Sequence, residues 1–318
     1  MKKLIMTLKN ALFYFSPKFV QRILLQVNLN RSVKEAKKRL NVIVSYEYLA
    51  QTFDSANIDG DLFVHTSLME VGKIEKGYKG VVKLLNEHVL DKNHTLLFSA
   101  LPFKGSSEEY LKGIDVFDSR NAPVAMGMIN EYYSMLSEAE RSLSPTHSVV
   151  AVGSKAKYYT VDHHLSETPF NENSPYFRIA QNKGKILMFG AGLKHLTIVH
   201  VLEDLLGDDF PFGVYAKKKF RVEVINKEGI SYPGIFKVHA GFQGIFRNTD
   251  VLTDPLKLLS STQVFKLGCS EFILLDARDV VVSLLETLKD GKTAYGKVRL
   301  SMKAREKADS WISYFKSL

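Results

Sequence analysis

The stretch KILMFGAG at residues 185–192 decides the fold class of this 318-residue chain. It is an apolar run that ends in a glycine-containing loop, and the segment LTIVHVLED at residues 196–204 follows closely. Short apolar runs bounded by glycine are typical of buried strands, whereas apolar residues spaced three and four apart are typical of helices. The two segments therefore predict a strand, a tight loop and a helix in succession.

The same alternation occurs on the N-terminal side of this unit. Strands that alternate with helices indicate an α/β fold, with a mainly parallel central sheet and flanking helices. Beyond the unit, strand-like runs dominate and predict a β-rich C-terminal part. The expected strands are 59–68, 94–101, 147–153, 220–225, 234–238 and 271–275, and the expected helices are 45–57, 79–90, 127–138 and 197–206.

The positive charge of the chain is confined to its N-terminal end. The chain carries 43 Lys and Arg and 34 Asp and Glu, which give a formal net charge of +9. Residues 1–40 hold ten of the basic residues and one acidic residue, so the remainder of the chain is neutral overall. A neutral body argues against nucleic-acid binding, because proteins of that class carry a basic surplus on the binding face.

Two regions follow from this charge distribution: a basic amphipathic N-terminal extension (1–44) and one large domain (45–318). Leu4, Leu8 and Leu12 share one helical face of the extension. Such a helix lies either on an anionic membrane surface, as a peripheral contact, or against the body of the protein or the second subunit of a homodimer. No apolar run reaches the length of about 18 residues that predicts a spanning helix.

The cysteine content and the N-terminus indicate a cytoplasmic protein, at the inner face of the membrane if the extension binds lipid. Cys269 is the single cysteine, which excludes an internal disulfide and fits a reducing compartment. The basic, apolar N-terminus resembles a secretory signal, but Lys9 interrupts its apolar run and no small-residue cleavage site follows. We therefore expect the extension to be retained.

Several short motifs match known functional signatures only in part. GAGLKH (190–195) has His195 where a dinucleotide-binding fingerprint needs its third glycine, and GKT (291–293) lacks the earlier glycine of a phosphate loop. Cys269 lies beside a strand-like run, where a small buried cysteine is the commoner role. The pair His163–His164 has no further Cys/His cluster beside it, so no metal site is expected.

Three other stretches place polar, chemically competent side chains next to predicted elements. GDLFVHTSLMEVG (60–72) delivers a histidine and two hydroxyls to the carboxyl end of a strand, where open α/β sheets bind ligands. RSLSPTHSVVAVG (141–153) surrounds a proline turn with polar groups just before another strand. The third stretch is LTIVHVLED itself. The candidate site residues are His65, Thr66 and Ser67; Arg141, Ser142 and His147; and Thr197, His200 and Glu203.

In this order and spacing, these motifs resemble the aminoglycoside 3-N-acetyltransferase family of antibiotic N-acetyltransferases. The resemblance covers about residues 45–275 and leaves out the basic extension. The matching positions are Gly60, Asp61, Val64–Leu68, Gly72, Asp118, Pro123, Gly127, Arg141, Ser142, Pro145, Ser148, Gly153, Ser174, Pro175, Gly184, Lys185, Gly190, Thr197, His200 and Glu203.

The resemblance implies that residues 45–318 form an acetyltransferase domain with acetyl-CoA as co-substrate. It implies no covalent acyl-enzyme and no nucleic-acid partner. The residues expected to contact acetyl-CoA are His65, Thr66, Ser67, Arg141 and Ser142; those expected to contact the acceptor are His147 and Glu203.

His200 is the expected general base of this reaction. A neutral imidazole suits removal of a proton from an ammonium nucleophile, and Glu203 at i+3 shares its helix face. Thr197 is the expected N-cap, which places His200 in the first turn, where the helix dipole favours a neutral ring. Taken without the other motifs, the same pattern describes a core histidine with Glu203 at the solvated edge of the helix.

The acceptor is predicted from a departure from the family pattern. Ser144 stands where the family has a histidine in its Arg-Ser-x-His-Pro motif, and His147 follows three positions later. With a neutral body that offers no acidic surplus, this favours an amino sugar, nucleotide-linked and destined for a surface polysaccharide. The alternatives are an aminoglycoside acceptor, as in antibiotic resistance, and a non-catalytic polysaccharide-assembly or binding protein.

Overall fold

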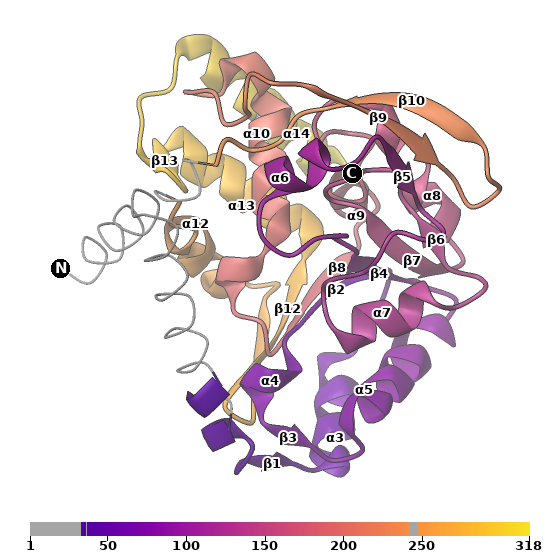
Figure 1. Cartoon of the computed structure of the whole chain (residues 1–318). Coiled ribbons are helices and arrows are strands. Elements are labelled where there is room, and N and C mark those ends of the chain that lie inside the picture. Colours follow the sequence, from indigo (N-terminus) through magenta and orange to yellow (C-terminus); the bar gives the residue numbers. More distant parts are fainter. Residues whose placement is uncertain (1–32, 36, 242–246) are drawn as a thin grey trace.

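Seven strands form one central sheet in the order β11-β12-β8-β2-β4-β7-β6 (Figure 1). The structure is a computed structural model that describes residues 33–35, 37–241 and 247–318, so most of the predicted extension (1–44) lies outside the described residues. The strands are β2 (Leu62–Thr66), β4 (Thr95–Ser99), β6 (Glu140–Arg141), β7 (Val149–Gly153), β8 (Lys185–Phe189), β11 (Gln263–Leu267) and β12 (Ser270–Asp276).

The α/β class with flanking helices is confirmed, but parallel pairing is limited to the centre of the sheet. Strand β2 lies parallel to both β4 and β8, whereas β7, β6, β12 and β11 all pair antiparallel to their neighbours. β11 and β12 form a hairpin that turns at Gly268. A buried apolar run reads the same in either direction, so the sequence pattern could not distinguish these outer strands from parallel ones.

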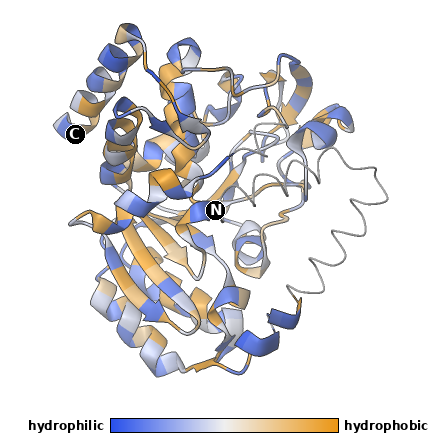
Figure 2. Ribbon diagram, turned by 90° about the vertical axis from the view of Figure 1, so that its left-hand side faces the viewer, coloured by the Kyte–Doolittle hydropathy of each residue, from blue (hydrophilic) through white to orange (hydrophobic). Residues whose placement is uncertain are grey.

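The sheet separates two hydrophobic cores because successive strand residues point to opposite faces. On β2, Phe63 packs into one core while Leu62 and Val64 pack into the other. Apolar colouring accordingly concentrates along the strands, between the helices (Figure 2). The first core is closed by α9 (Pro175–Gln181), α10 (Val201–Leu206), α13 (Ala277–Lys289) and α14 (Met302–Ser317), and the second by α3 (Tyr46–Ala56), α5 (Gly77–Leu85) and α7 (Met128–Ser134).

A smaller sheet lies beside the first, with β9 at its centre. β9 pairs antiparallel with β10 and parallel with β5, and the three strands enclose a separate apolar cluster. Its strands are β5 (Val116–Asp118), β9 (Phe220–Ile225) and β10 (Ser231–Phe236). The remaining short elements are β1 (Ile43–Val44), α4 (Leu68–Val71), β3 (Lys73–Ile74), α6 (Ser107–Lys112), α8 (Ala156–Thr160), α12 (Asp250–Thr253), β13 (Lys292–Thr293) and β14 (Gly296–Lys297).

The C-terminal part contains the expected strands, but it ends in two helices that the prediction of a β-rich region omitted. Asp276 caps the first turn of α13 by accepting from the backbone N–H groups of Arg278 and Asp279. Helix α14 packs against α13 and α10. Trp311 on α14 donates its Nε1–H to the carbonyl of Leu205 at 3.1 Å, so the last helix is tied to the helix that carries Glu203.

No helix in the described part of the chain is both long enough and apolar enough to cross a bilayer.

Candidate active site

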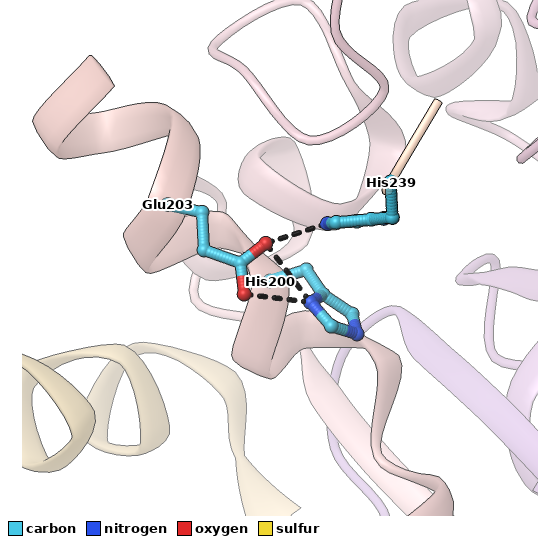
Figure 3. A group of neighbouring side chains, drawn as sticks. All are labelled: His200, Glu203 and His239. Atoms are coloured by element: carbon cyan, nitrogen blue, oxygen red, sulfur yellow. Dashed lines mark hydrogen bonds and ion pairs between the residues drawn. The ribbon is translucent and has the colours of Figure 1, made fainter. Parts of the chain in front are cut away.

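His200 and Glu203 meet at the start of helix α10. Residues 197–200 form a 3-10 turn that continues into α10, which places the two side chains on one face. Nδ1 of His200 lies 3.0 Å from Oε1 and 3.1 Å from Oε2 of Glu203 (Figure 3). The exposed fractions of the two residues are only 6% and 4%. Glu203 is therefore an internal partner of the histidine and not a solvated helix edge.

Glu203 accepts hydrogen bonds from two further side chains. His239 Nε2 lies 2.6 Å from Oε2 (Figure 3). The Tyr295 hydroxyl donates to Oε1 at 2.9 Å. Burial acts to raise the pKa of Glu203, but the charges and hydrogen bonds of His200 and His239 outweigh it and hold that pKa below its ordinary value. The carboxylate is thus ionised and saturated with donors.

An aromatic and histidine shell surrounds this centre. The ring of Phe170 lies 5.2 Å from that of His200, 5.8 Å from that of His239 and 4.7 Å from that of His147, centroid to centroid. Burial, followed by the neighbouring His239, lowers the pKa of His147 well below the ordinary value of a histidine. The predicted acceptor-side residue His147 therefore lies, as a neutral ring, beside the pair of His200 and Glu203, which we call the dyad.

Arg247 contacts the other ring nitrogen of His200. Its Nη1 lies 2.9 Å from Nε2 of His200. A carboxylate can only accept and a guanidinium can only donate, so the neutral form of His200 that fits these contacts has its proton on Nδ1 and its lone pair on Nε2. This tautomer is the one that a general base requires when its oriented nitrogen is Nδ1.

A hollow of about 250 Å³ opens at the carboxyl ends of β2, β4 and β8. It brings together three of the predicted acetyl-CoA contacts, which lie at and just after the end of β2, and Thr197 of the 3-10 turn. Burial, with a smaller effect of His195, lowers the pKa of His65 to about 4, so this ring is neutral. The polar lining residues are His65, Thr66, Ser67, Ser99, Asn130, His195 and Thr197.

Gly190 brings the ends of β2 and β8 together under this hollow. The residue has φ +71°, and a Cβ there would lie 2.6 Å from the carbonyl oxygen of Ser67 and 2.5 Å from Cγ2 of Val71. The N–H of Ser67 also donates to the carbonyl of Phe189 at 2.9 Å. Only glycine allows this close approach without displacement of the Ser67 loop.

A second hollow, of about 270 Å³, lies on the Glu203 side of the same turn. Three carboxylates line it: Glu203, Asp204 and Asp208. Burial raises the pKa of Asp204 to about 6, although Tyr215 and the N–H of Phe170 donate to it. Lys237 is the one basic residue in the lining. Although the body of the protein is neutral overall, acidic side chains therefore outnumber basic ones in this hollow next to the dyad.

Three predicted site residues take other positions. Thr197 is the first residue of the 3-10 turn and makes no side-chain cap, so the expectation of an N-cap is wrong; Leu196 precedes the turn, and His200 occupies the N-cap position of α10. Ser142 is fully buried, with its hydroxyl shared between His163 Nδ1 and the N–H of Val149.

Arg141 is likewise engaged within the protein. Its guanidinium donates to the carbonyls of Ala100, Ala122 and Pro123 and lies over the ring of Phe117. Burial lowers the pKa of Arg141 to about 10. The structure therefore gives the side chains of Arg141 and Ser142 internal contacts and does not bring them into the hollow beside β2.

His200, Glu203 and His239 each offer one possible metal-ligand atom, and these three atoms lie within 4.8 Å of one another. Among the described residues this is the one group of that kind. A ligand histidine must present a lone pair to the ion, whereas Nδ1 of His200 and Nε2 of His239 both donate to the carboxylate. The group is accounted for as a hydrogen-bond network, and we assign no metal to it.

His239, Tyr295 and Arg247 were not among the residues predicted from sequence. They lie 36 and 92 residues from Glu203 and 47 residues from His200, respectively. No local spacing links them to the dyad, because each comes from a different segment that only the folded chain brings close. The isolated bridge between Tyr215 and His239 is what positions the second histidine.

Comparison with known proteins places this fold and site in one family. The family described as aminoglycoside 3-N-acetyltransferase matches residues 63–289, and the chain belongs to it. The match includes the strand-end hollow and the dyad, and it ends at the last residue of α13.

Individual relatives agree with this assignment. Aminoglycoside N(3)-acetyltransferase III of Serratia marcescens is 34% identical over 158 residues, which are 45% of this chain and 58% of that protein. The chain thus spans little more than half the length of the curated relatives it matches.

Solved structures of acetyltransferases share this fold, among them two that carry a ligand. AAC-IIIb in a binary complex with CoASH has a TM-score of 0.63 at 22% identity, covering 78% of this chain and 97% of that one. Sisomicin-bound AAC-VIa has a TM-score of 0.60 at 20% identity, covering 79% and 99%.

Proposed function

We propose that the protein is an acetyl-CoA-dependent N-acetyltransferase that uses His200 as its general base. The observation that carries this proposal is the contact of His200 Nδ1 with Glu203, which orients the ring so that Nε2 points away from the carboxylate and toward Arg247. Thr197, the first residue of the turn, lines the strand-end hollow, and Glu203, in the first turn of α10, lines the acidic one. Donor and acceptor substrates therefore each have a compartment next to the base.

The reaction can be written with these residues in named roles. His200 takes a proton from the acceptor ammonium at Nε2 and passes it to solvent; the freed amine nitrogen then forms a bond to the thioester carbonyl carbon and gives a second N–H proton to Nε2. Glu203 stabilises the imidazolium that results, through Nδ1. The tetrahedral intermediate then expels the CoA sulfur by breaking the C–S bond, and the proton on His200 passes to the sulfur. The products are an amide and free CoA thiol.

The acceptor that the site favours is a polycationic amino sugar of the aminoglycoside kind. The acidic hollow offers Asp204 and Asp208 beside Glu203, which suits a second ammonium group on the same molecule. The names of the related enzymes support the same acceptor, and the family membership supports the acetyl transfer. This was the alternative acceptor in the sequence analysis.

The nucleotide-linked acceptor receives less support. A nucleotide brings phosphates, and three carboxylates with a single lysine form an unfavourable lining for them. None of the relatives named above is an enzyme of polysaccharide synthesis. The remaining argument for it is Ser144, whose hydroxyl accepts from the backbone N–H of His147 and so helps to place that ring.

Release of CoA thiol tests the proposal. Full-length protein is mixed with acetyl-CoA and either an aminoglycoside panel or a nucleotide-linked amino sugar, and the thiol is followed colorimetrically. We expect release with aminoglycosides, and a loss of about 10²–10⁴-fold in kcat for His200→Asn with little change in melting temperature. The matched control is His94→Asn, a partly exposed histidine near Asp59. If thiol is released with the nucleotide-linked amino sugar alone, that sugar replaces the aminoglycoside as the proposed acceptor. If no amine causes thiol release, the protein is better described as a binding protein.

A further inference from the structure

Arg247 occupies the place at which the base must meet its substrate. An acceptor nitrogen has to come within about 2.6–3.2 Å of Nε2 of His200 for proton transfer. Nη1 of Arg247 already lies 2.9 Å from that atom. The guanidinium N–H is a cationic donor aimed at the lone pair, as the N–H of an acceptor ammonium would be. The two groups cannot hold the same position, so Arg247 must shift before the base can act.

The guanidinium has little to hold it there apart from His200. Arg247 is exposed, and among the described residues no carboxylate lies within 4.0 Å of its guanidinium nitrogens. A charged fork of donors without an anionic partner is suited to bind negative charge elsewhere in the site. Because the guanidinium stays attached to the backbone at position 247, a shift by about one hydrogen-bond length still leaves it next to the attacking nitrogen of the acceptor amine.

We propose that Arg247 is a further catalytic residue, which covers Nε2 of His200 in the free protein and donates to the thioester oxygen during the reaction. The proposal rests on the proposed acetyl transfer and adds a role that neither the motifs nor the dyad contain. It also gives the free protein a defined resting arrangement, in which the base is covered by one of its own residues until the acceptor arrives.

The role follows the electrons of the addition step. As the amine nitrogen bonds to the carbonyl carbon, the C=O π pair moves to the oxygen and forms an oxyanion, which lies close to that nitrogen. Arg247 donates to this oxyanion through its free N–H groups. His200 takes an N–H proton from the nitrogen that has bonded to the carbonyl carbon. When the C–S bond breaks, the oxyanion pair re-forms C=O, the sulfur leaves as thiolate, and it takes that proton from His200, so the products are a neutral amide and CoA thiol. Donors aimed at developing charge contribute about 10²–10³-fold in kcat.

Chemical labelling of His200 tests the covering contact without turnover. Diethyl pyrocarbonate acylates the unprotonated nitrogen of imidazole, and mass spectrometry measures its rate on the peptide that contains His200. Arg247→Ala should raise that rate several-fold over wild type, since Nε2 is uncovered. Arg305→Ala, an exposed arginine on α14, is the matched control and should leave it unchanged. Equal rates in wild type and Arg247→Ala would overturn the proposal.

Steady-state kinetics tests the catalytic contact. Arg247→Ala should lose about 10²–10³-fold in kcat while the KM for acetyl-CoA changes little. Arg247→Lys should recover part of the loss, because it keeps the charge but not the planar fork. A kcat of Arg247→Ala close to wild type would overturn the proposal and leave the oxyanion to the Thr66–Ser67 loop. If the wild type itself transfers no acetyl group, the proposed function fails, and the labelling result alone still shows whether Arg247 covers the base.

Discussion

His239 contacts the carboxylate of Glu203 at 2.6 Å, from a position 36 residues further along the chain. With the contact of Tyr295, it extends the predicted His200–Glu203 pair into a network of four residues. A single carboxylate therefore orients His200, the proposed base, and also joins α10 to the segments that carry His239 and Tyr295. Substitution of Glu203 should for this reason affect both rate and stability.

The pH dependence of stability should reveal this double role. The folded-state pKa of Glu203 lies below its ordinary value of 4.5, so its stabilising contribution is present above that value and is lost as pH falls below it. Between about pH 6 and pH 3, the difference in free energy of unfolding between wild type and Glu203→Gln should shrink. Urea titrations at each pH measure it. Glu228→Gln, an exposed residue, should show no such trend; a constant difference for Glu203→Gln would contradict the assignment.

Gly190→Ala should disrupt the strand-end hollow. The new Cβ would meet the carbonyl oxygen of Ser67 at 2.6 Å, and φ +71° is unfavourable for alanine. We expect a loss of about 2 kcal/mol or more in unfolding free energy, together with weaker CoA binding as the Ser67 loop moves. Thermal unfolding with and without CoA measures both effects. Gly192→Ala is the matched control because no atom lies within 4 Å of its Cβ position. Similar losses in the two variants would contradict the prediction.

Asp208→Asn should weaken binding of the acceptor. Asp208 is an exposed carboxylate in the lining of the acidic hollow, and it faces the compartment assigned to the amino sugar. We expect the KM for a polycationic acceptor to rise about threefold to tenfold, as for a solvent-screened charge, with the KM for acetyl-CoA unchanged. Asp290→Asn, an exposed aspartate outside that lining, serves as the control. If the KM for acetyl-CoA rises instead, the acidic hollow binds acetyl-CoA and the assignment of the two hollows is reversed.

Arg141→Lys should behave as a stability variant. The guanidinium donates to the carbonyls of Ala100, Ala122 and Pro123, and an ammonium cannot satisfy all three with the same geometry. We expect a loss of about 1–3 kcal/mol in unfolding free energy with the KM for acetyl-CoA unchanged. Chemical denaturation and thiol-release kinetics on the same preparation measure both. A raised KM at unchanged stability would restore Arg141 to the cofactor side, as the family resemblance implied.

Most of the central fold could be predicted from local pattern. The strands of the sheet are short apolar runs bounded by turns, and His200 and Glu203 were found because i and i+3 share a helix face. Helix α13 was also within reach, since Asp276 caps it and Val280, Leu284 and Leu288 follow at helical spacing. The direction of the outer strands could not be predicted, because strand pairing depends on contacts between segments that are distant in the sequence.

The remainder of the site could not be predicted, for a related reason. His239, Arg247 and Tyr295 each lie in a segment with no motif, and each has meaning only next to α10. Arg141 shows a different limit: it matches the family motif and was predicted to contact acetyl-CoA, and in the folded chain its guanidinium donates to backbone carbonyls, so the cofactor contact stays a prediction. A motif match identified the position without indicating which way the side chain points.

The contact between Trp311 and Leu205 gives the protein an intrinsic optical reporter. Trp311 is the one tryptophan in the chain, and its indole N–H is bonded to the carbonyl of Leu205, two residues after Glu203. Indole emission shifts in wavelength when its hydrogen bonding or surroundings change. Fluorescence excited at the tryptophan band therefore reads out the helix that carries Glu203, without any label, as each substrate is added.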